Sequence, residues 1–96
     1  MRPLNVMPIS DLIDQVSQIC KRNGVQRLDL FGSFATGTAT PTSDIDFVVY
    51  GCKDILHLED ELADIDTLRK IDLFDYDSIK NEYLLEDIKK YGKQIY

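Results

Sequence analysis

The sequence is poor in cysteine and has no long apolar run. Its two cysteines, Cys20 and Cys52, do not form a CxxC pair, so we expect reduced thiols in a cytoplasmic protein. No apolar run approaches the roughly 20 residues of a membrane span. The chain also does not open with a basic and apolar leader segment. We therefore expect neither export nor insertion into a membrane.

Positive charge is scarce as well. The 96 residues include 11 Lys and Arg against 17 Asp and Glu, which gives a formal net charge of -6. Residues 1–43 carry four basic and three acidic residues, whereas residues 44–96 carry seven basic and fourteen acidic residues. General binding to nucleic acid depends on Lys and Arg against phosphate, so we do not expect direct nucleic-acid binding. An anionic substrate would need the help of metal ions.

The remaining composition is typical of a soluble globular domain, with 44% hydrophobic and 29% charged residues. A chain of this length buries somewhat under ~70% of its unfolded surface, which allows one core and not two. We therefore expect residues 1–96 to form a single domain.

The periodicity of apolar residues predicts three helices and three strands. The first helix has its start signals at Pro8 and Ser10 and its stop signals at residues 21–24. It is followed in chain order by strands over 25–31 and 44–50, a helix over 52–70, a strand over 70–76, and a helix from about Asp77 or Ser78 to Gly92. This order predicts an α/β fold, in which helices pack on one side of a small mixed sheet. The 12 residues between the first two strands form a long connection, and such loops are often functional.

Two carboxylates lie at the start of the second predicted strand. Asp44 and Asp46 point to the same face, roughly 6 to 7 Å apart, because strand side chains alternate. Carboxylates held this close repel each other, and burying them unpaired costs several kcal/mol. A hard cation such as Mg²⁺ between them would remove the repulsion. An isolated pair of this kind is nevertheless more often solvated at a strand edge.

Two further features favour a metal site. Gly32 and Ser33 end the first strand, where glycine lets backbone approach a ligand and serine offers a hydroxyl and an N–H to phosphate. Asp72 adds a third carboxylate within an apolar strand, while Asp75 has the opposite parity and is the weaker candidate. Three carboxylates beside a phosphate-holding Gly-Ser are what two-metal phosphoryl transfer requires.

The spacing Gly32-Ser33, ten residues, Asp44-Ile45-Asp46 resembles the GSx10DxD motif of the minimal nucleotidyltransferases in the polymerase-β-like superfamily. The likeness covers nearly the whole chain and implies the fold of that superfamily. It also implies transfer of AMP from ATP, with two Mg²⁺ ions, onto a tyrosine hydroxyl of a HEPN-domain toxin. The chain would then be the antitoxin of a toxin–antitoxin pair. Such a pair is a hetero-oligomer, and a homo-oligomer stays open.

The resemblance also assigns roles to individual residues. Asp44 and Asp46 would bind both metals, and Asp72 would complete the metal nearer the attacking hydroxyl and act as its base. Gly32 and Ser33 would hold the terminal phosphates of the nucleotide. Ser43 has two interpretations, a turn or cap in the loop and, secondarily, a contact with the nucleotide.

One departure from the family pattern supports an alternative function. Many relatives carry arginine after Gly-Ser, as in GSRARG, whereas this chain has GSFATG with the uncharged Phe34 and Thr36. The alternative is a catalytically weak or inactive nucleotide-binding module that neutralises its partner by binding alone. The intact set of three carboxylates opposes it. Transfer of AMP to a small molecule is disfavoured, because no residues are left for a substrate domain.

The remaining polar residues have structural interpretations. His57 has no second histidine nearby, so we expect an exposed helix residue and not a zinc ligand. Asp29 lies far from the motif and is expected at the surface. The acidic residues of the second helix are expected to form a solvated face or, as the second interpretation, an interface for a basic partner.

Overall fold

The structure of the protein is a computed structural model, which describes residues 7–96. The predicted single domain includes residues 1–6, which lie outside the described residues. Helix α1 (Ile9–Arg22) begins after Pro8 and confirms the first predicted helix. Asp11 lies in its first turn and two basic residues lie in its last turn, an arrangement that complements the helix dipole.

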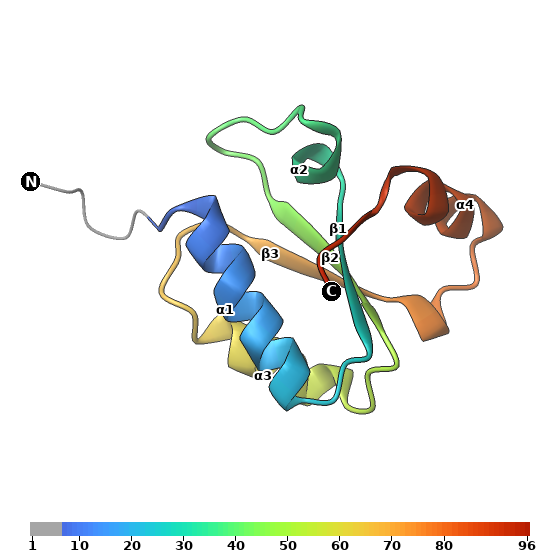
Figure 1. Ribbon diagram of the computed structural model, residues 1–96, viewed down its shortest axis with the longest axis horizontal. Helices are drawn as coiled ribbons and strands as arrows, with labels where there is room; N and C mark the ends of the chain where they lie inside the picture. Colours follow the sequence, from blue (N-terminus) through green and yellow to red (C-terminus); the bar gives the residue numbers. More distant parts are fainter. Residues whose placement is uncertain (1–6) are drawn as a thin grey trace, which may run out of the picture.

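Four strands form one mixed sheet in the order β3-β2-β1-β4 (Figure 1). They are β1 (Arg27–Phe31), β2 (Ile45–Tyr50), β3 (Ile71–Asp75) and β4 (Lys93–Gln94). Strand β1 is antiparallel to β2 and β4, whereas β2 and β3 are parallel. The three predicted strands are confirmed. The two-residue β4 was not predicted, because it pairs through its backbone and has no apolar alternation.

Three more helices follow α1. They are the short α2 (Ser33–Thr36), α3 (Ile55–Ala63) and α4 (Glu82–Tyr91). Helix α3 is shorter than the predicted 52–70, since its N-cap is Asp54 and its C-cap is Asp64. The predicted N-caps of the last helix are wrong. Asp77 and Ser78 lie in a 3₁₀ turn, η1 (Tyr76–Ser78), and Asn81 caps α4 by accepting hydrogen bonds from two backbone N–H groups.

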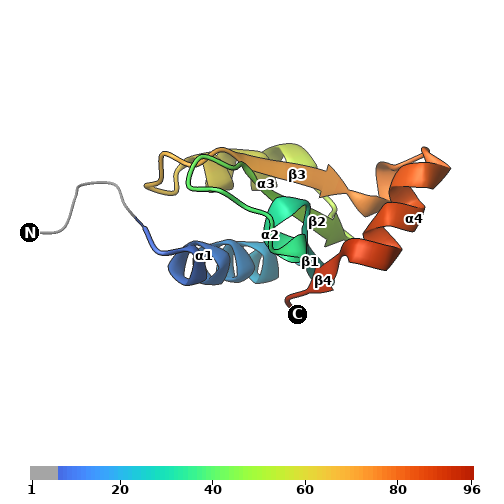
Figure 2. The ribbon, with the colours of Figure 1, turned by 90° about the horizontal axis from the view of Figure 1, so that it is seen from above.

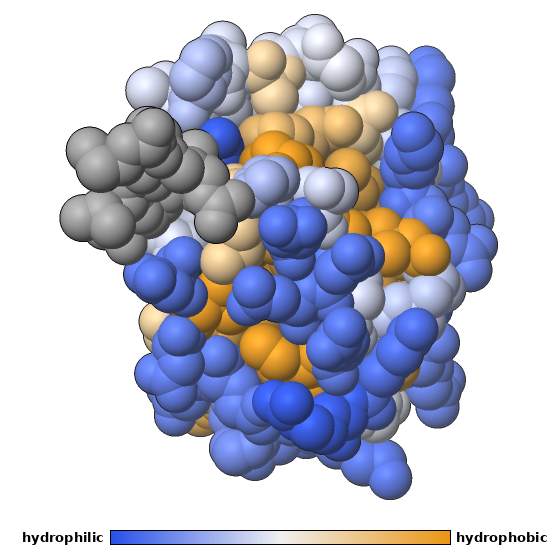
Figure 3. All heavy atoms as spheres, turned by 60° about the vertical axis from the view of Figure 1, so that its left-hand side comes forward, coloured by the Kyte–Doolittle hydropathy of each residue, from blue (hydrophilic) through white to orange (hydrophobic). Residues whose placement is uncertain are grey.

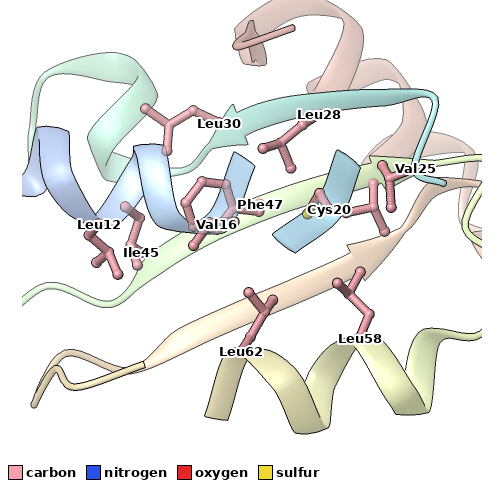
Figure 4. Packing of buried hydrophobic residues seen from close by; sticks show 11 residues of the cluster. Leu12, Val16, Cys20, Val25, Leu28, Leu30, Ile45, Phe47, Leu58 and Leu62 are labelled. Carbon is pink, nitrogen blue, oxygen red and sulfur yellow. The ribbon is translucent and has the colours of Figure 1, made fainter. Parts of the chain in front are cut away.

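The main core lies between one face of the sheet and helices α1 and α3 (Figure 4). It contains alternate residues of β1 and β2, the inner faces of both helices, and Val25 from the connection before β1: Leu12, Val16, Cys20, Val25, Leu28, Leu30, Ile45, Phe47, Val49, Leu58 and Leu62. Full burial of one such large apolar side chain contributes about 1.5–3 kcal/mol. The core therefore fixes β2, and with it the direction in which the alternate residues of β2 point.

Helix α4 lies on the other side of the strands from α1 and α3 (Figures 1 and 2). The expectation that all helices share one side of the sheet is therefore wrong. A Cβ at Gly92, which follows α4, would lie 3.5 Å from Asp29 Oδ2. Because Asp29 alternates with the core residues of β1, this contact places the end of α4 on the opposite face.

Asp29 is buried, with 1% of its surface exposed, so its predicted surface role is wrong. The Arg27 Nε donates to Asp29 Oδ1 at 2.9 Å, and the Tyr50 hydroxyl donates to Asp29 Oδ2 at 2.7 Å. Burial, and then the hydrogen bond to Asp29, raise the pKa of Tyr50. A paired and hydrogen-bonded carboxylate of this kind is a structural element of the fold.

Candidate active site

The parallel pairing of β2 and β3 brings two predicted site residues together. Asp46 and Asp72 are Cα partners in the register, and both alternate with residues that face the core. Asp75 pairs with the core residue Val49, so it lies on the other face of the sheet from Asp72. The register thus places Asp72, and not Asp75, beside Asp46.

The carboxylate of Asp46 is in an environment that opposes its negative charge. Burial raises its pKa above the ordinary value of 3.8, and the adjacent Asp72 raises it further. Asp44 adds a smaller effect of the same sign, whereas Lys70 acts against it. All three acidic residues of the predicted site therefore interact. A cation is the natural way to relieve this repulsion.

The three carboxylates do not form a closed metal cage. Asp44 lies just before β2 and is exposed, whereas Asp46 and Asp72 are half-buried. Within residues 7–96, no group of three His, Cys, Asp or Glu side chains is close enough to hold a metal ion. Mg²⁺ usually takes one or two carboxylates and completes its shell with water and substrate phosphates. The hard oxygen donors present here fit an ion that arrives with such ligands.

Gly32 lies against the Asp46 carboxylate. A Cβ at position 32 would lie 2.3 Å from Asp46 Oδ2, closer than atoms can approach. The φ of +69° and ψ of -148° also belong to a region that glycine alone adopts readily. The sequence predicted a close approach of Gly32 to a ligand. The structure shows that the residue it approaches is one of the predicted metal ligands, so the two halves of the motif are in contact.

Ser33 begins α2, and Gly37 ends that helix in the left-handed conformation. The loop that follows is closed by Ser43, whose Oγ accepts a hydrogen bond from the Thr40 N–H at 2.8 Å. The Ser43 N–H donates back to the Thr40 carbonyl at 3.1 Å. These bonds support the turn interpretation of Ser43, and its contact with a nucleotide stays a prediction, as do the roles of Gly32 and Ser33 in holding phosphates.

Sequence reasoning missed a basic residue at this site. The Arg69 guanidinium lies over the Phe34 ring, 5.0 Å from its centroid, and donates to the Ser43 carbonyl. Arg69 stands far from both halves of the motif in the sequence, so motif spacing gave no sign of it. The one available signal was the basic pair Arg69-Lys70 directly before the strand that carries Asp72.

Arg69 lines a hollow of about 580 Å³ between the loop and the α3–β3 connection. Its walls are residues 41–44 on one side and residues 67–70 on the other, with Met7 at the edge. Figure 3 brings this side of the molecule forward and shows polar and charged residues around apolar patches. A second hollow, of about 340 Å³, lies between α3 and β3 and includes Asp72 in its wall. Asp44 and Asp72 thus each border a recess of the surface.

The remaining expectations from the sequence concern features outside this site. His57 is exposed, and its Nε2 lies 2.8 Å from Glu61 Oε1, which confirms an ordinary helix residue. Cys20 and Cys52 are both unpaired. No helix within residues 7–96 has the length and apolar character needed to cross a membrane.

Comparison with known proteins identifies relatives over most of the chain. The family model described as "Polymerase beta, Nucleotidyltransferase" matches residues 14–96. The protein named "Putative protein adenylyltransferase MJ0128", from Methanocaldococcus jannaschii, is 34% identical over 91 residues. That match covers 88% of this chain and 92% of the relative.

Solved structures have the same architecture. A chain in a crystal structure of a toxin–antitoxin with AMP-PNP matches with a TM-score of 0.69 and 29% identity, over 86% of this chain and 71% of that chain. A chain in a mutant of the toxin–antitoxin MntA–HpeT matches with a TM-score of 0.68 and 28% identity, over 88% and 71%. These matches confirm the fold predicted from the GSx10DxD motif. The chain belongs to the polymerase beta nucleotidyltransferase family.

Proposed function

We propose that the protein transfers AMP from ATP to a tyrosine hydroxyl of a HEPN-domain toxin and thereby acts as its antitoxin. The contact of Gly32 with Asp46, beside Asp72, is the observation that carries this proposal. This contact joins the turn at Gly32 to the carboxylates, in a chain that belongs to a nucleotidyltransferase family. The adenylyltransferase name of one relative and the toxin–antitoxin structures of others support the acceptor class.

In the proposed reaction the acceptor oxygen attacks the α-phosphorus of ATP, the bond to the β-phosphate oxygen breaks, and pyrophosphate leaves. Asp44 and Asp46 would hold two Mg²⁺ ions, and Asp72 would complete one of them and take the proton of the hydroxyl. Bound metals of this kind activate the attacking oxygen and stabilise the leaving phosphate. Gly32 and Ser33 would hold the terminal phosphates, and Ser43 would border the nucleotide.

The partner would form a hetero-oligomer with this chain in the cytoplasm. The unpaired Cys20 and Cys52 support a reducing compartment. Direct binding to nucleic acid is not part of the proposal, since the chain carries a net charge of -6.

A second candidate function is neutralisation by binding alone. It is favoured by Phe34 and Thr36, which leave the turn after Gly32 and Ser33 without a charge. In this case the protein would bind nucleotide weakly or without turnover. The carboxylates and their register would then have no catalytic use.

The dependence of ATP binding on Mg²⁺ tests the proposed metal site, which is required both for binding ATP and for catalysis. We expect calorimetry to show that ATP binds at least about tenfold more tightly with Mg²⁺ than with EDTA. This corresponds to a difference in binding free energy of at least roughly 1.4 kcal/mol. Asp72→Asn should reduce the difference, because it removes a charge beside Asp46. Asp75→Asn is the matched control, since it changes the same strand on the other face. Equal ATP affinities with and without Mg²⁺ in the wild type would contradict the proposal.

A further inference from the structure

Arg69 is held in place at three points. Its backbone N–H donates to Thr67 Oγ1 at 3.1 Å, its guanidinium lies over the Phe34 ring, and its Nη1 donates to the Ser43 carbonyl at 2.5 Å. Phe34 itself packs against the main core, so it forms a fixed platform for the guanidinium. The side chain of Arg69 is thus ordered before any ligand binds.

These contacts place the guanidinium between the two halves of the motif. Phe34 directly follows Ser33, and Ser43 directly precedes Asp44. The guanidinium therefore contacts the residue next to the turn proposed to hold phosphates and the residue next to the first proposed metal ligand. The turn itself has no basic residue, since α2 has the sequence SFAT.

The charge of Arg69 is not neutralised by the protein. Among residues 7–96, no carboxylate oxygen lies within 4.0 Å of its guanidinium, although acidic residues outnumber basic ones in this half of the chain. The neighbouring Lys70 differs, because its Nζ lies 3.7 Å from Asp72 Oδ1. Arg69 and Lys70 are the basic residues of the hollow described above. The arginine is therefore the one with charge available for an incoming anion.

We propose that Arg69 binds the polyphosphate of the nucleotide and supplies the cationic contact that the turn after Gly32-Ser33 lacks. The inference rests on the proposed function, because it assumes that a nucleotide occupies this site. A guanidinium has five N–H donors in a planar fork, which suits phosphate oxygens. One donor goes to Ser43 and the others remain for the ligand. Since the side chain is already fixed, binding costs little further rotamer entropy.

The number of phosphates on the ligand tests this assignment. In the presence of Mg²⁺, Arg69→Ala should weaken ATP binding by about 10- to 100-fold, the effect of losing one hydrogen bond to a charged group. The loss should be smaller for ADP and smallest for AMP, which has no polyphosphate. Arg22→Ala is the control for charge, because Arg22 is an exposed arginine paired with Glu61 at the far end of α1, and it should bind ATP as the wild type does.

Two further variants separate binding from support of the loop. Arg69→Lys keeps the charge without the planar fork and should give an intermediate ATP affinity. Phe34→Arg in the Arg69→Ala background returns a guanidinium directly after Ser33 and should recover part of the ATP affinity, which a purely structural role would not allow.

Thermal unfolding of each variant shows whether it is folded at the temperature of the binding measurement. Arg69 has no role in phosphate binding if Arg69→Ala binds ATP as tightly as the wild type, or if ATP, ADP and AMP lose affinity equally. In either case Mg²⁺-dependent ATP binding by the wild type would leave the proposed function intact. A wild type that does not bind ATP would overturn both.

Discussion

At the scale of single residues, the site depends on a glycine that leaves room for a carboxylate. Gly32 combines a positive φ with a position where any Cβ would collide with Asp46 Oδ2. Two independent constraints therefore require glycine at position 32. One is the backbone conformation, and the other is the space that Asp46 occupies. Substitution of Gly32 should therefore change both the free energy of unfolding and metal binding, and the two effects can be measured separately.

Gly32→Ala should lower the free energy of unfolding by at least about 1–3 kcal/mol from backbone strain alone, and it should also abolish the Mg²⁺ dependence of ATP binding. Gly24→Ala is the matched control, because Gly24 also has a positive φ, of +77°, but nothing lies within 4 Å of its Cβ position. The control should be destabilised while it binds Mg²⁺ and ATP normally. Urea unfolding and calorimetry measure the two effects. Loss of the Mg²⁺ dependence in both variants would refute a specific role of the Gly32 contact.

The carboxyl group of Asp46 makes the stability of the folded protein depend on pH. Its carboxyl pKa is raised by burial and by Asp72, so the folded state binds the proton more tightly than the unfolded state does. This carboxyl therefore destabilises the folded protein fully above its raised pKa, and the penalty disappears as the pH falls below the ordinary value of 3.8.

Asp46→Asn should accordingly raise the free energy of unfolding at pH 7 by up to about 1 kcal/mol, a limit set by the partial exposure of the carboxylate. The gain should shrink to nothing near pH 3. Urea unfolding of both proteins across this range measures it. The interpretation fails if the gain is larger in acid than at neutral pH.

At the scale of elements, the sequence predicted the three longer strands because their apolar and β-branched residues alternate or cluster. It also predicted that Asp46 and Asp72 lie on strands, and Asp72 was preferred to Asp75. The alignment of Asp46 with Asp72 could not be predicted, since register depends on pairing between distant segments. The brief β4 and the contact of Arg69 with Phe34 likewise depend on tertiary structure.

Asp29 shows a different limit of sequence reasoning. One acidic residue in a strand is usually solvated, and the distance of Asp29 from the motif in the sequence favoured a surface position. Its burial depends on Arg27, on Tyr50 and on the end of α4, which together surround its carboxylate. Distant partners of this kind leave no mark in local periodicity.

The loop over residues 37–44 is the element most open to ordering by a ligand. Its described hydrogen bonds are mainly turns among its own residues, such as Thr40 with Ser43. We expect its amides to exchange rapidly in the free protein and to gain protection with ATP and Mg²⁺, because a bound nucleotide would contact the Ser43 end of the loop. Hydrogen exchange measures this, with α1 as the internal control. Full protection in the free protein would show that the loop is rigid without ligand.

At the scale of the whole molecule, the two faces of the sheet have different uses. One face is covered by α1 and α3 and holds the main core, whereas the other face carries Asp46 and Asp72. The strand β2 serves both, because its alternate residues point to opposite sides. A stable core thereby supports an acidic site on a small chain whose net charge of -6 disfavours anions unless cations accompany them.

The two candidate functions, transfer of AMP and neutralisation by binding alone, predict different masses for the toxin. The measurement is intact-mass spectrometry of the HEPN-domain toxin after incubation with ATP, Mg²⁺ and either wild-type protein or the Asp44→Asn, Asp46→Asn double variant. The wild type should add the mass of AMP. The double variant should fold and still bind the toxin but modify it slower by orders of magnitude, since the lost metal sites stabilise the transition state. A wild type that never changes the toxin mass, yet neutralises the toxin as well as the double variant does, would contradict the proposed transfer and establish neutralisation by binding.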